Sequence, residues 1–199
     1  MKKRIIFATG NENKMIEIRE IFADLDYDIC SMKEAGIAVE VEENGSTFEE
    51  NAMLKAKAIA EQCQDIVLAD DSGLEIDYLN KEPGIYSARY LGHDTSYTYK
   101  NEKILEKLAG VPDDKRTARF VCAIAAVFPD GHTMVKRATI EGRIGHEIAG
   151  ENGFGYDPIF YVPEYGCTTA QLTPEQKNAI SHRGKALRFI REELEKQAK

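Results

Sequence analysis

The stretch Asp65-Ile66-Val67-Leu68-Ala69-Asp70-Asp71-Ser72-Gly73-Leu74 decides how we expect the rest of this 199-residue chain to be organised. Ile66 to Ala69 form a short, continuous apolar segment, which is typical of a strand covered on both faces of a sheet. The Asp-Ser-Gly that follows favours a turn, so the strand is predicted to end on its two carboxylates. Ligands of open α/β sheets bind at that edge, which makes the two acids candidate site residues.

The adjacent carboxylates of Asp70 and Asp71 repel each other and need compensation. A divalent cation with oxygen ligands would supply it and leave one carboxylate oxygen free to act as a base. The competing explanation is an Asx-turn that only closes the strand, which is the commoner outcome for an isolated Asp-Asp-Ser-Gly. The choice between the two depends on the other segments of the chain.

The composition is that of an ordinary soluble globular protein, with 43% hydrophobic and 30% charged residues and no apolar run long enough to span a bilayer. We expect one domain over residues 1–199, in the cytoplasm and away from membranes, because the apolar run after the basic start is too short for a signal peptide. The net charge of −8 argues against broad nucleic-acid binding but allows a local basic pocket. Four cysteines lack the spacing of a zinc site or a redox pair, so reduced thiols are expected at Cys30, Cys63, Cys122 and Cys167.

A polar loop opens the first predicted helix and favours an anion. Residues 4–8 have a strand pattern, and Thr9-Gly10-Asn11-Glu12-Asn13-Lys14 leads into helical periodicity that continues to Leu25. Backbone N–H groups at a helix start, together with a nearby lysine, suit a phosphate group. A plain strand-to-helix turn capped by asparagine explains the same residues equally well.

A second helix is predicted over residues 47–63, because a Ser-x-x-Glu spacing typical of a capping box begins at Ser46. Lys55 lies on this helix and could reach into a pocket bordered by Glu42 and Glu43. A solvent-exposed lysine is the commoner outcome for such a position. The remaining patterns predict strands over 27–31 and 74–79, a helix over 95–108, a hairpin over 117–141, a short helix from Thr173 and a C-terminal helix.

The segment Gly150-Glu151-Asn152-Gly153-Phe154-Gly155-Tyr156-Asp157-Pro158 is flexible backbone that carries aromatic side chains. Phe154 between two glycines suits stacking on a nucleobase, although a phenylalanine tucked into the core is an equally simple explanation. Lys177 follows the start of the next short helix, and Ser181-His182-Arg183-Gly184 leads into the last one. His182 and Arg183 could also be ordinary residues of a helix start.

Taken together, these segments resemble the inosine triphosphate pyrophosphatase family over nearly the whole chain. The resemblance rests on Thr9-Gly10-Asn11 with Lys14, Phe48 to Lys55, Ala69 to Leu74, Pro83 to Tyr90, Gly153 to Pro158, and Ser181 to Gly184, which follow in the family's order. It implies an α/β fold with an elongated mixed β-sheet flanked by helices, two lobes around a nucleotide-binding cleft, a Mg²⁺ requirement and a homodimer. Glu12 adds an unusual carboxylate to the phosphate loop.

The resemblance also implies a reaction, in which water attacks the α-phosphorus of a non-standard purine nucleoside triphosphate and releases pyrophosphate. Asp71 is then the general base and a metal ligand, Glu42 is the second metal ligand, and Asp70 supports them. Phosphoryl chemistry of this kind depends on positioning and on charge neutralisation. The resemblance assigns the triphosphate to Thr9, Asn11, Lys14, Lys55, Ser72 and Lys177, and the base to Phe154, Asp157, His182 and Arg183. It also counts Gly10, Glu12, Asn13, Gly155 and Tyr156 among the substrate-binding residues.

Three other functions are compatible with some of these residues. A pyrophosphatase of similar architecture could act on pyrimidine or modified triphosphates. A regulator could bind nucleotides without turnover, although the paired acids argue against it. A nucleic-acid-binding module is disfavoured by the net charge and by the absence of a basic stripe.

Overall fold

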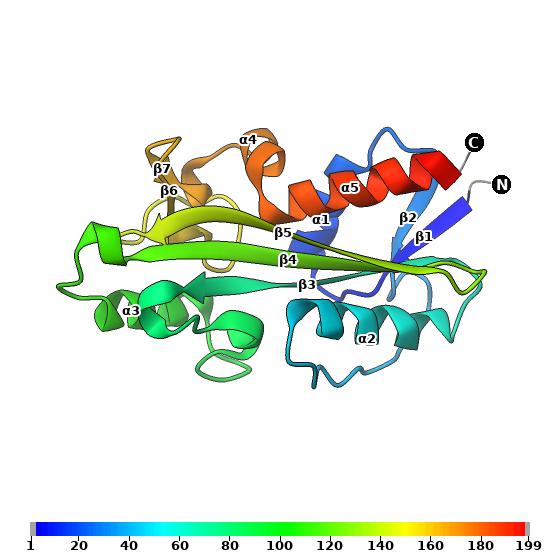
Figure 1. The fold of residues 1–199 in the computed structure, drawn as a ribbon, viewed down its shortest axis with the longest axis horizontal. Helices are drawn as coiled ribbons and strands as arrows, with labels where there is room; N and C mark the ends of the chain where they lie inside the picture. Colours follow the sequence, from blue (N-terminus) through cyan, green and yellow to red (C-terminus); the bar gives the residue numbers. More distant parts are fainter. Residues whose placement is uncertain (1–2, 198–199) are drawn as a thin grey trace. The chain divides into compact units, whose positions relative to one another are not determined.

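The computed structural model describes residues 3–197, which form a seven-stranded mixed sheet with helices packed on it (Figure 1). The strand order is β2-β1-β3-β4-β5-β6-β7, in which β1 is parallel to β2 and β3, and β6 is antiparallel to β5 and β7. The strands are β1 Lys3–Phe7, β2 Tyr27–Ser31, β3 Ile66–Ile76, β4 Thr117–Val127, β5 Thr133–Ile144, β6 Phe160–Val162 and β7 Cys167–Thr168. The expected α/β class with a mixed sheet is confirmed.

Five α-helices accompany the sheet within the described residues, each starting where the sequence provides a cap or an apolar face. Asn11, Thr47, Ser96 and Thr173 cap the first four through side-chain oxygens that accept backbone N–H groups. The helices are α1 Glu12–Ile21, α2 Phe48–Ala60, α3 Tyr97–Lys107, α4 Pro174–Ile180 and α5 His182–Gln197. None of the helices in residues 3–197 is both long and apolar enough to cross a membrane.

The chain divides into two compact units, and unit 1 contains the chain up to Asp71, Cys122–Ala138 and the part from Arg183 onward. Its core joins α1 and α5 to one face of β1, β3 and β4, with Phe7, Ile18 and Leu187 among the fully buried side chains. Helix α2 covers the other face of these strands (Figure 1). Because both faces are covered, the middle of the sheet carries continuous apolar runs, such as Ile5 to Phe7 and Val67 to Ala69.

Unit 2 contains Ser72–Val121 and Thr139–His182 and has a core of its own. Leu74, Ile104 and Phe160 are fully buried there, and the rings of Phe120 and Phe160 lie 4.3 Å apart. A 3₁₀ helix over Gly84–Arg89 packs into this unit through the buried Ser87. Each unit therefore carries its own share of the predicted site residues on its own core.

The prediction that a strand ends at Asp70 and Asp71 is wrong. Strand β3 continues through Ser72 and Gly73 to Ile76, so the expected separate strand over 74–79 is its second half followed by a 3₁₀ turn. The reason is burial, since Leu74 and Ile76 are fully buried in the core of unit 2 and extend the apolar pattern past the acids. Local turn chemistry was overridden by tertiary packing.

Helix boundaries differ modestly from those expected. The cap of α2 is Thr47 rather than Ser46, and Glu50 rather than Glu49 completes the capping arrangement by accepting from the Ser46 backbone N–H at 2.7 Å. The helix ends at Ala60 instead of residue 63. The predicted strand over 27–31 and the predicted hairpin are confirmed, the latter extending to Ile144.

Candidate functional site

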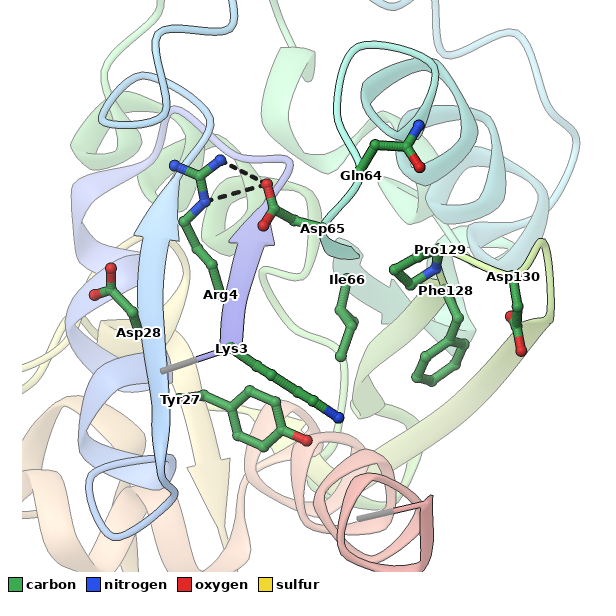
Figure 2. A pocket seen from close by; sticks show the side chains of 10 residues that line it. All are labelled: Lys3, Arg4, Tyr27, Asp28, Gln64, Asp65, Ile66, Phe128, Pro129 and Asp130. Atoms are coloured by element: carbon green, nitrogen blue, oxygen red, sulfur yellow. Dashed lines mark hydrogen bonds and ion pairs between the residues drawn. The ribbon is translucent and has the colours of Figure 1, made fainter. Parts of the chain in front are cut away.

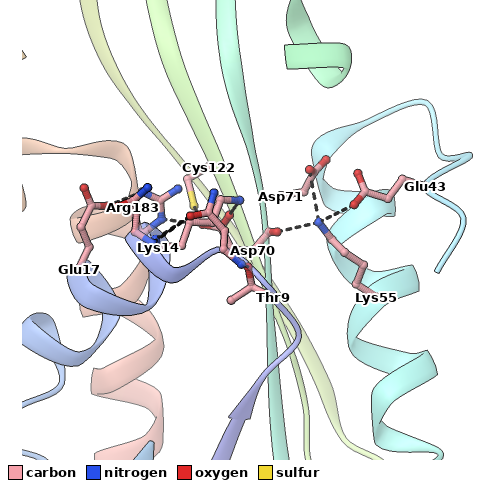
Figure 3. A network of polar contacts seen from close by, with 11 residues as sticks. Thr9, Lys14, Glu17, Glu43, Lys55, Asp70, Asp71, Cys122 and Arg183 are labelled. Carbon is pink, nitrogen blue, oxygen red and sulfur yellow. Dashed lines mark hydrogen bonds and ion pairs between the residues drawn. The ribbon is translucent and has the colours of Figure 1, made fainter. Parts of the chain in front are cut away.

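The two central acids point to opposite faces of one strand. Successive side chains of a strand alternate between faces, so Asp70 and Asp71 on β3 cannot serve one binding surface together. Figure 3 shows the consequence, with Asp70 directed toward Lys14 and Arg183, and Asp71 directed toward Lys55. The pair is therefore two separate centres, both in unit 1, and the expected mutual repulsion is reduced by separate partners.

Asp70 is the centre of a buried ion-pair cluster. It accepts from Arg183 Nε at 2.9 Å and from Lys14 Nζ, and Cys122 Sγ donates to it at 3.1 Å. Arg183 also pairs with Glu17 through its other side. Burial alone would raise the pKa of Asp70, but the cations of Arg183 and Lys14 outweigh it and hold that pKa well below its usual range. The two cations thus favour the charged form of the Asp70 carboxyl.

Asp71 has the opposite electrostatic character. It is 6% exposed, and burial raises the pKa of its carboxyl although Lys55 opposes that shift. Its Oδ1 lies 3.5 Å from Lys55 Nζ, whereas its buried Oδ2 has no hydrogen-bond partner within residues 3–197. A buried carboxylate oxygen without a partner is costly, and such atoms in native proteins mark a site for a proton, a water or a cation. Asp71 has the features of a general base or a metal ligand.

Lys55 holds this centre together from helix α2. Its ammonium donates to the Asp70 backbone carbonyl at 2.8 Å and lies 3.0 Å from Glu43 Oε1 (Figure 3). Burial would lower the pKa of Lys55, but Asp71 and Glu43 outweigh it and raise it. Of the two acids expected beside Lys55, Glu43 lies next to it and Glu42 is exposed.

The acidic segment is fastened to α2 by a short-range clamp. Asn51 is fully buried, and its Oδ1 accepts the Gly45 backbone N–H at 2.8 Å. A Cβ on Gly45 would lie 2.7 Å from that same oxygen, so only glycine fits there. The clamp fixes the backbone that carries Glu43 beside Lys55 and Asp71.

The predicted metal ligands fit a Mg²⁺ ion in part. Within the described residues 3–197, no three His, Cys, Asp or Glu side chains are grouped as a self-sufficient metal site. Mg²⁺ keeps several waters and is held by one or two carboxylates plus substrate phosphates, so a full protein cage is not needed. Asp71 Oδ2, which has no hydrogen-bond partner within residues 3–197, and the nearby Glu43 would supply the one or two carboxylates that such an ion takes, whereas the predicted Glu42 is exposed.

The predicted phosphate loop lies between β1 and α1 in unit 1. Asn11 caps the helix by accepting from the N–H groups of Asn13 and Lys14 at 3.0 and 3.2 Å, and Thr9 Oγ1 accepts from Asn11 N. Gly10, Glu12 and Asn13 are exposed. Part of the helix N-terminus is therefore already satisfied by the loop, and Lys14 is ion-paired with Asp70 rather than extended into solvent.

In unit 2, Asp157 is the centre of a second buried cluster. Its Oδ2 accepts from Lys177 Nζ at 2.6 Å and from the Phe154 backbone N–H at 2.8 Å, and its Oδ1 accepts from Thr169 at 2.8 Å. Lys177 Nζ also lies 4.8 Å from the centre of the Phe154 ring. The structure thus joins three predicted residues of unit 2 through one carboxylate.

The glycines on either side of Phe154 are required by the backbone. Gly153 has φ +72°, and a Cβ there would lie 2.2 Å from Asp157 Oδ2; Gly155 has φ +66°. Phe154 is half-buried, whereas Tyr156 is buried and donates to the Ser87 carbonyl at 2.6 Å. Tyr156 is therefore a core residue, and Phe154 is the aromatic ring of the loop that retains exposed surface.

The other predicted residues of unit 2 lie in different settings. His182 is 6% exposed, and its ring stacks on Phe120 with centres 4.9 Å apart. Ser72 is half-buried on β3. Three residues of the two buried clusters were not predicted: Glu17, Cys122 and Thr169. Glu17 and Cys122 sit within apolar patterns that signal only core packing.

A separate pocket of about 980 Å³ lies elsewhere in unit 1 and contains none of the predicted residues (Figure 2). It is formed where β1, β2 and β3 begin, and the Arg4–Asp65 ion pair stands in its wall. Ligands of parallel sheets bind at the carboxyl ends of the strands, where the Thr9–Lys14 loop is found. This pocket is therefore a poor candidate for the main site.

Comparison with known proteins confirms the resemblance drawn from the sequence. The model of the Ham1 family matches residues 5–193. A protein of Exiguobacterium sibiricum named dITP/XTP pyrophosphatase is 51% identical over 94% of each chain, and one of Clostridium perfringens with the same name is 48% identical over 96% of this chain and 97% of its own. The solved structure of the Staphylococcus aureus Ham1 protein has a TM-score of 0.87 and 47% identity, covering 98% of this chain and all of that one.

Proposed function

Because this chain belongs to the Ham1 family, we propose that it is a nucleoside-triphosphate pyrophosphatase that removes non-standard purine nucleotides. The substrates would be the triphosphates of xanthosine, inosine and deoxyinosine, and the products the monophosphate and pyrophosphate. The activity in the names of its relatives supports this proposal. The observation that carries it is the buried Asp71, whose Oδ2 has no partner within residues 3–197, next to the Lys55 ammonium.

Asp71 is proposed to accept a proton from the attacking water. A carboxyl whose pKa is raised by burial is better matched to this role near neutral pH than an exposed one. Mg²⁺ would be held by Asp71 and a glutamate, and when bound it supplies positive charge to the phosphate oxygens. Glu42 was predicted as that glutamate, but Glu43 is the one beside Lys55, so the two are to be tested side by side.

The triphosphate is proposed to lie against the cations and the loop of unit 1. Lys55 and Lys14 are anchored by carboxylates, so their ammonium groups are held in place before a substrate arrives, and this lowers the entropy cost of binding. Thr9, Asn11 and Ser72 offer short polar side chains. Lys177 was also predicted to contact phosphate, but its partner Asp157 favours a role beside Phe154.

The base is proposed to stack on Phe154, with His182 reading its edge. A 6-keto purine presents an acceptor at O6, where adenine presents an amino donor, so a donor in the site separates the two. Arg183 and Asp157 were predicted as further readers of the base. Both are buried and ion-paired within their own clusters, which favours supporting roles, so their contact with the base stays a prediction.

The test is a panel of purified triphosphates of inosine, xanthosine, guanosine, adenosine and cytidine, each assayed for pyrophosphate with and without Mg²⁺. We expect pyrophosphate from the first two, only with Mg²⁺, and slow release from the others. Preference for a pyrimidine would favour the related pyrophosphatase, and binding without product would favour a regulator. The same panel run on Glu42→Gln and Glu43→Gln identifies the metal-binding glutamate by the larger rise in the Mg²⁺ concentration required. A homodimer and a cytoplasmic location stay predictions.

A further inference from the structure

Helix α3 contains a buried amide that none of the roles above accounts for. Asn101 is 2% exposed, and its Nδ2 donates to the Gly155 backbone carbonyl at 3.1 Å, across 54 residues of sequence. Its Oδ1 is also buried but has no hydrogen-bond partner within residues 3–197. The reverse orientation of the amide would oppose two acceptors at Gly155, so the donor assignment is the consistent one.

An unpaired buried oxygen weakens the folded state, so stability alone does not explain an asparagine at this position. What the side chain does provide is a donor of fixed direction to one carbonyl. That carbonyl belongs to Gly155, the residue directly after Phe154. Gly155 has φ +66° and lies in a turn, outside the helices and strands.

Helix α3 contacts this glycine in a second way. A Cβ on Gly155 would lie 3.6 Å from the ring of Tyr97, which is ordinary van der Waals contact, so the ring lies against the loop. The Tyr97 ring also packs edge-on against Tyr156, with centres 5.2 Å apart and planes at 90°. On the other side of Phe154, Asp157 holds its backbone N–H. The backbone on both sides of the Phe154 side chain is therefore held: Asp157 accepts the Phe154 N–H, and Asn101 on α3 donates to the Gly155 carbonyl.

We propose that Asn101 is a positioning residue for base recognition: by holding the Gly155 carbonyl, it fixes the Phe154 ring in the orientation that a purine base stacks on. The proposal rests on the function proposed above for Phe154. It concerns the base only, since the hydrogen bond of Asn101 goes to the loop that carries Phe154. Loss of Asn101 therefore weakens binding of ligands that carry a base and spares ligands made of phosphate alone.

The experiment compares Asn101→Ala with Lys100→Met, its neighbour on α3. Lys100 is 1% exposed, donates to a different backbone carbonyl, that of Ala88, at 2.6 Å, and lies 4.7 Å from the centre of the Tyr97 ring. Lys100→Met therefore removes a buried donor and a contact with Tyr97 but keeps the hydrogen bond from Asn101 to Gly155. For each protein we measure KM for inosine triphosphate, the inhibition constant of inorganic tripolyphosphate, the calorimetric Kd of inosine monophosphate, and Tm. Asn101→Asp, which keeps the shape but replaces the donor with an acceptor, is a third variant.

Both alanine and aspartate at position 101 should raise KM and the Kd of the monophosphate by about 5- to 100-fold, the range of a lost base-stacking contact, and leave tripolyphosphate inhibition unchanged. Lys100→Met should lower Tm without changing the ratio of the Kd of inosine monophosphate to the inhibition constant of tripolyphosphate. The proposal would be overturned if tripolyphosphate binding weakened as much as binding of the monophosphate. It would also be overturned if the variants at 100 and 101 showed the same ratio of the two constants. Absence of pyrophosphate release by the wild type would refute the proposed function instead, and the Kd values would still decide the role of Asn101.

Discussion

Asp71 is the residue on which the proposed chemistry depends most. Asp71→Asn keeps the shape of the side chain but removes its ability to accept a proton, so turnover of inosine triphosphate should fall by about 10²- to 10⁴-fold while binding is partly retained. Pyrophosphate release measures the turnover, and calorimetry with the same triphosphate measures the binding that is retained. Near-normal turnover by a folded Asp71→Asn protein would remove Asp71 from the mechanism.

Its neighbour Asp70 should affect stability instead. Asp70→Asn leaves the buried charges of Arg183 and Lys14 without their carboxylate, which costs about 3–5 kcal/mol of unfolding free energy. Because the pKa of Asp70 is lowered on folding, its stabilisation is present above the ordinary value of 3.8 and is lost as pH falls below it. Urea unfolding from pH 7 to about pH 2 should show a shallower loss of stability below pH 3.8 in the variant, and identical pH profiles would contradict this assignment.

Substitution of Arg183 distinguishes a supporting role of this residue from direct recognition of the base. Since its guanidinium pairs with Asp70 and Glu17, Arg183→Ala should lower Tm and reduce kcat/KM for inosine and adenosine triphosphates by similar factors. The kcat/KM values of both substrates, measured well below Tm, provide the check. A loss confined to inosine triphosphate would instead restore the base-reading role predicted from the sequence.

At the scale of elements, the loop around Phe154 needs glycine at position 153, because of both its backbone conformation and the space around it. Gly153→Ala brings a Cβ to 2.2 Å from Asp157 Oδ2 at φ +72°, so the loop must move. Gly110 has a similar φ of +75° with open space around it, which makes Gly110→Ala the matched control for backbone strain alone. Both should lose about 1–2 kcal/mol of stability, the cost of a left-handed conformation, but only Gly153→Ala should raise KM for inosine triphosphate. Equal KM values would place the loop outside the site.

Strand β3 shows why some elements could be predicted and others could not. The apolar run from Ile66 to Ala69 was enough to identify its first half, because a short continuous apolar run next to turn residues is typical of a fully buried strand. The second half was missed, since Ser72 and Gly73 favour a turn locally and only the burial of Leu74 in another core keeps them extended. The cap at Thr47 was misplaced for a related reason, because two Ser/Thr-x-x-Glu spacings overlap there.

The partners of charged residues were the least predictable part of the site. The sequence indicated which lysines and acids matter, but it could not show that Asp70 and Asp71 serve opposite faces, since that follows from the strand continuing through them. Glu17 and Cys122 lie in apolar patterns, and nothing local distinguishes them from core residues. Position in space, rather than residue type, decided which of Glu42 and Glu43 lies beside Lys55.

At the scale of the whole molecule, a family resemblance carried over nearly the entire chain is what connects these clusters to one reaction. Composition and net charge argued against membrane-spanning and nucleic-acid-binding classes but could not select an activity. The two units each contain part of the predicted residues.

The most direct test of the central claim is one competition reaction. Inosine, xanthosine, guanosine and adenosine triphosphates are mixed in equal amounts with the wild-type protein and Mg²⁺ in H₂¹⁸O, and nucleotides and phosphates are followed by mass spectrometry. We predict that inosine and xanthosine triphosphates disappear first, that the label appears in their monophosphates, and that pyrophosphate is released unlabelled. Release of orthophosphate with nucleoside diphosphates, or equal consumption of all four triphosphates, would contradict the account.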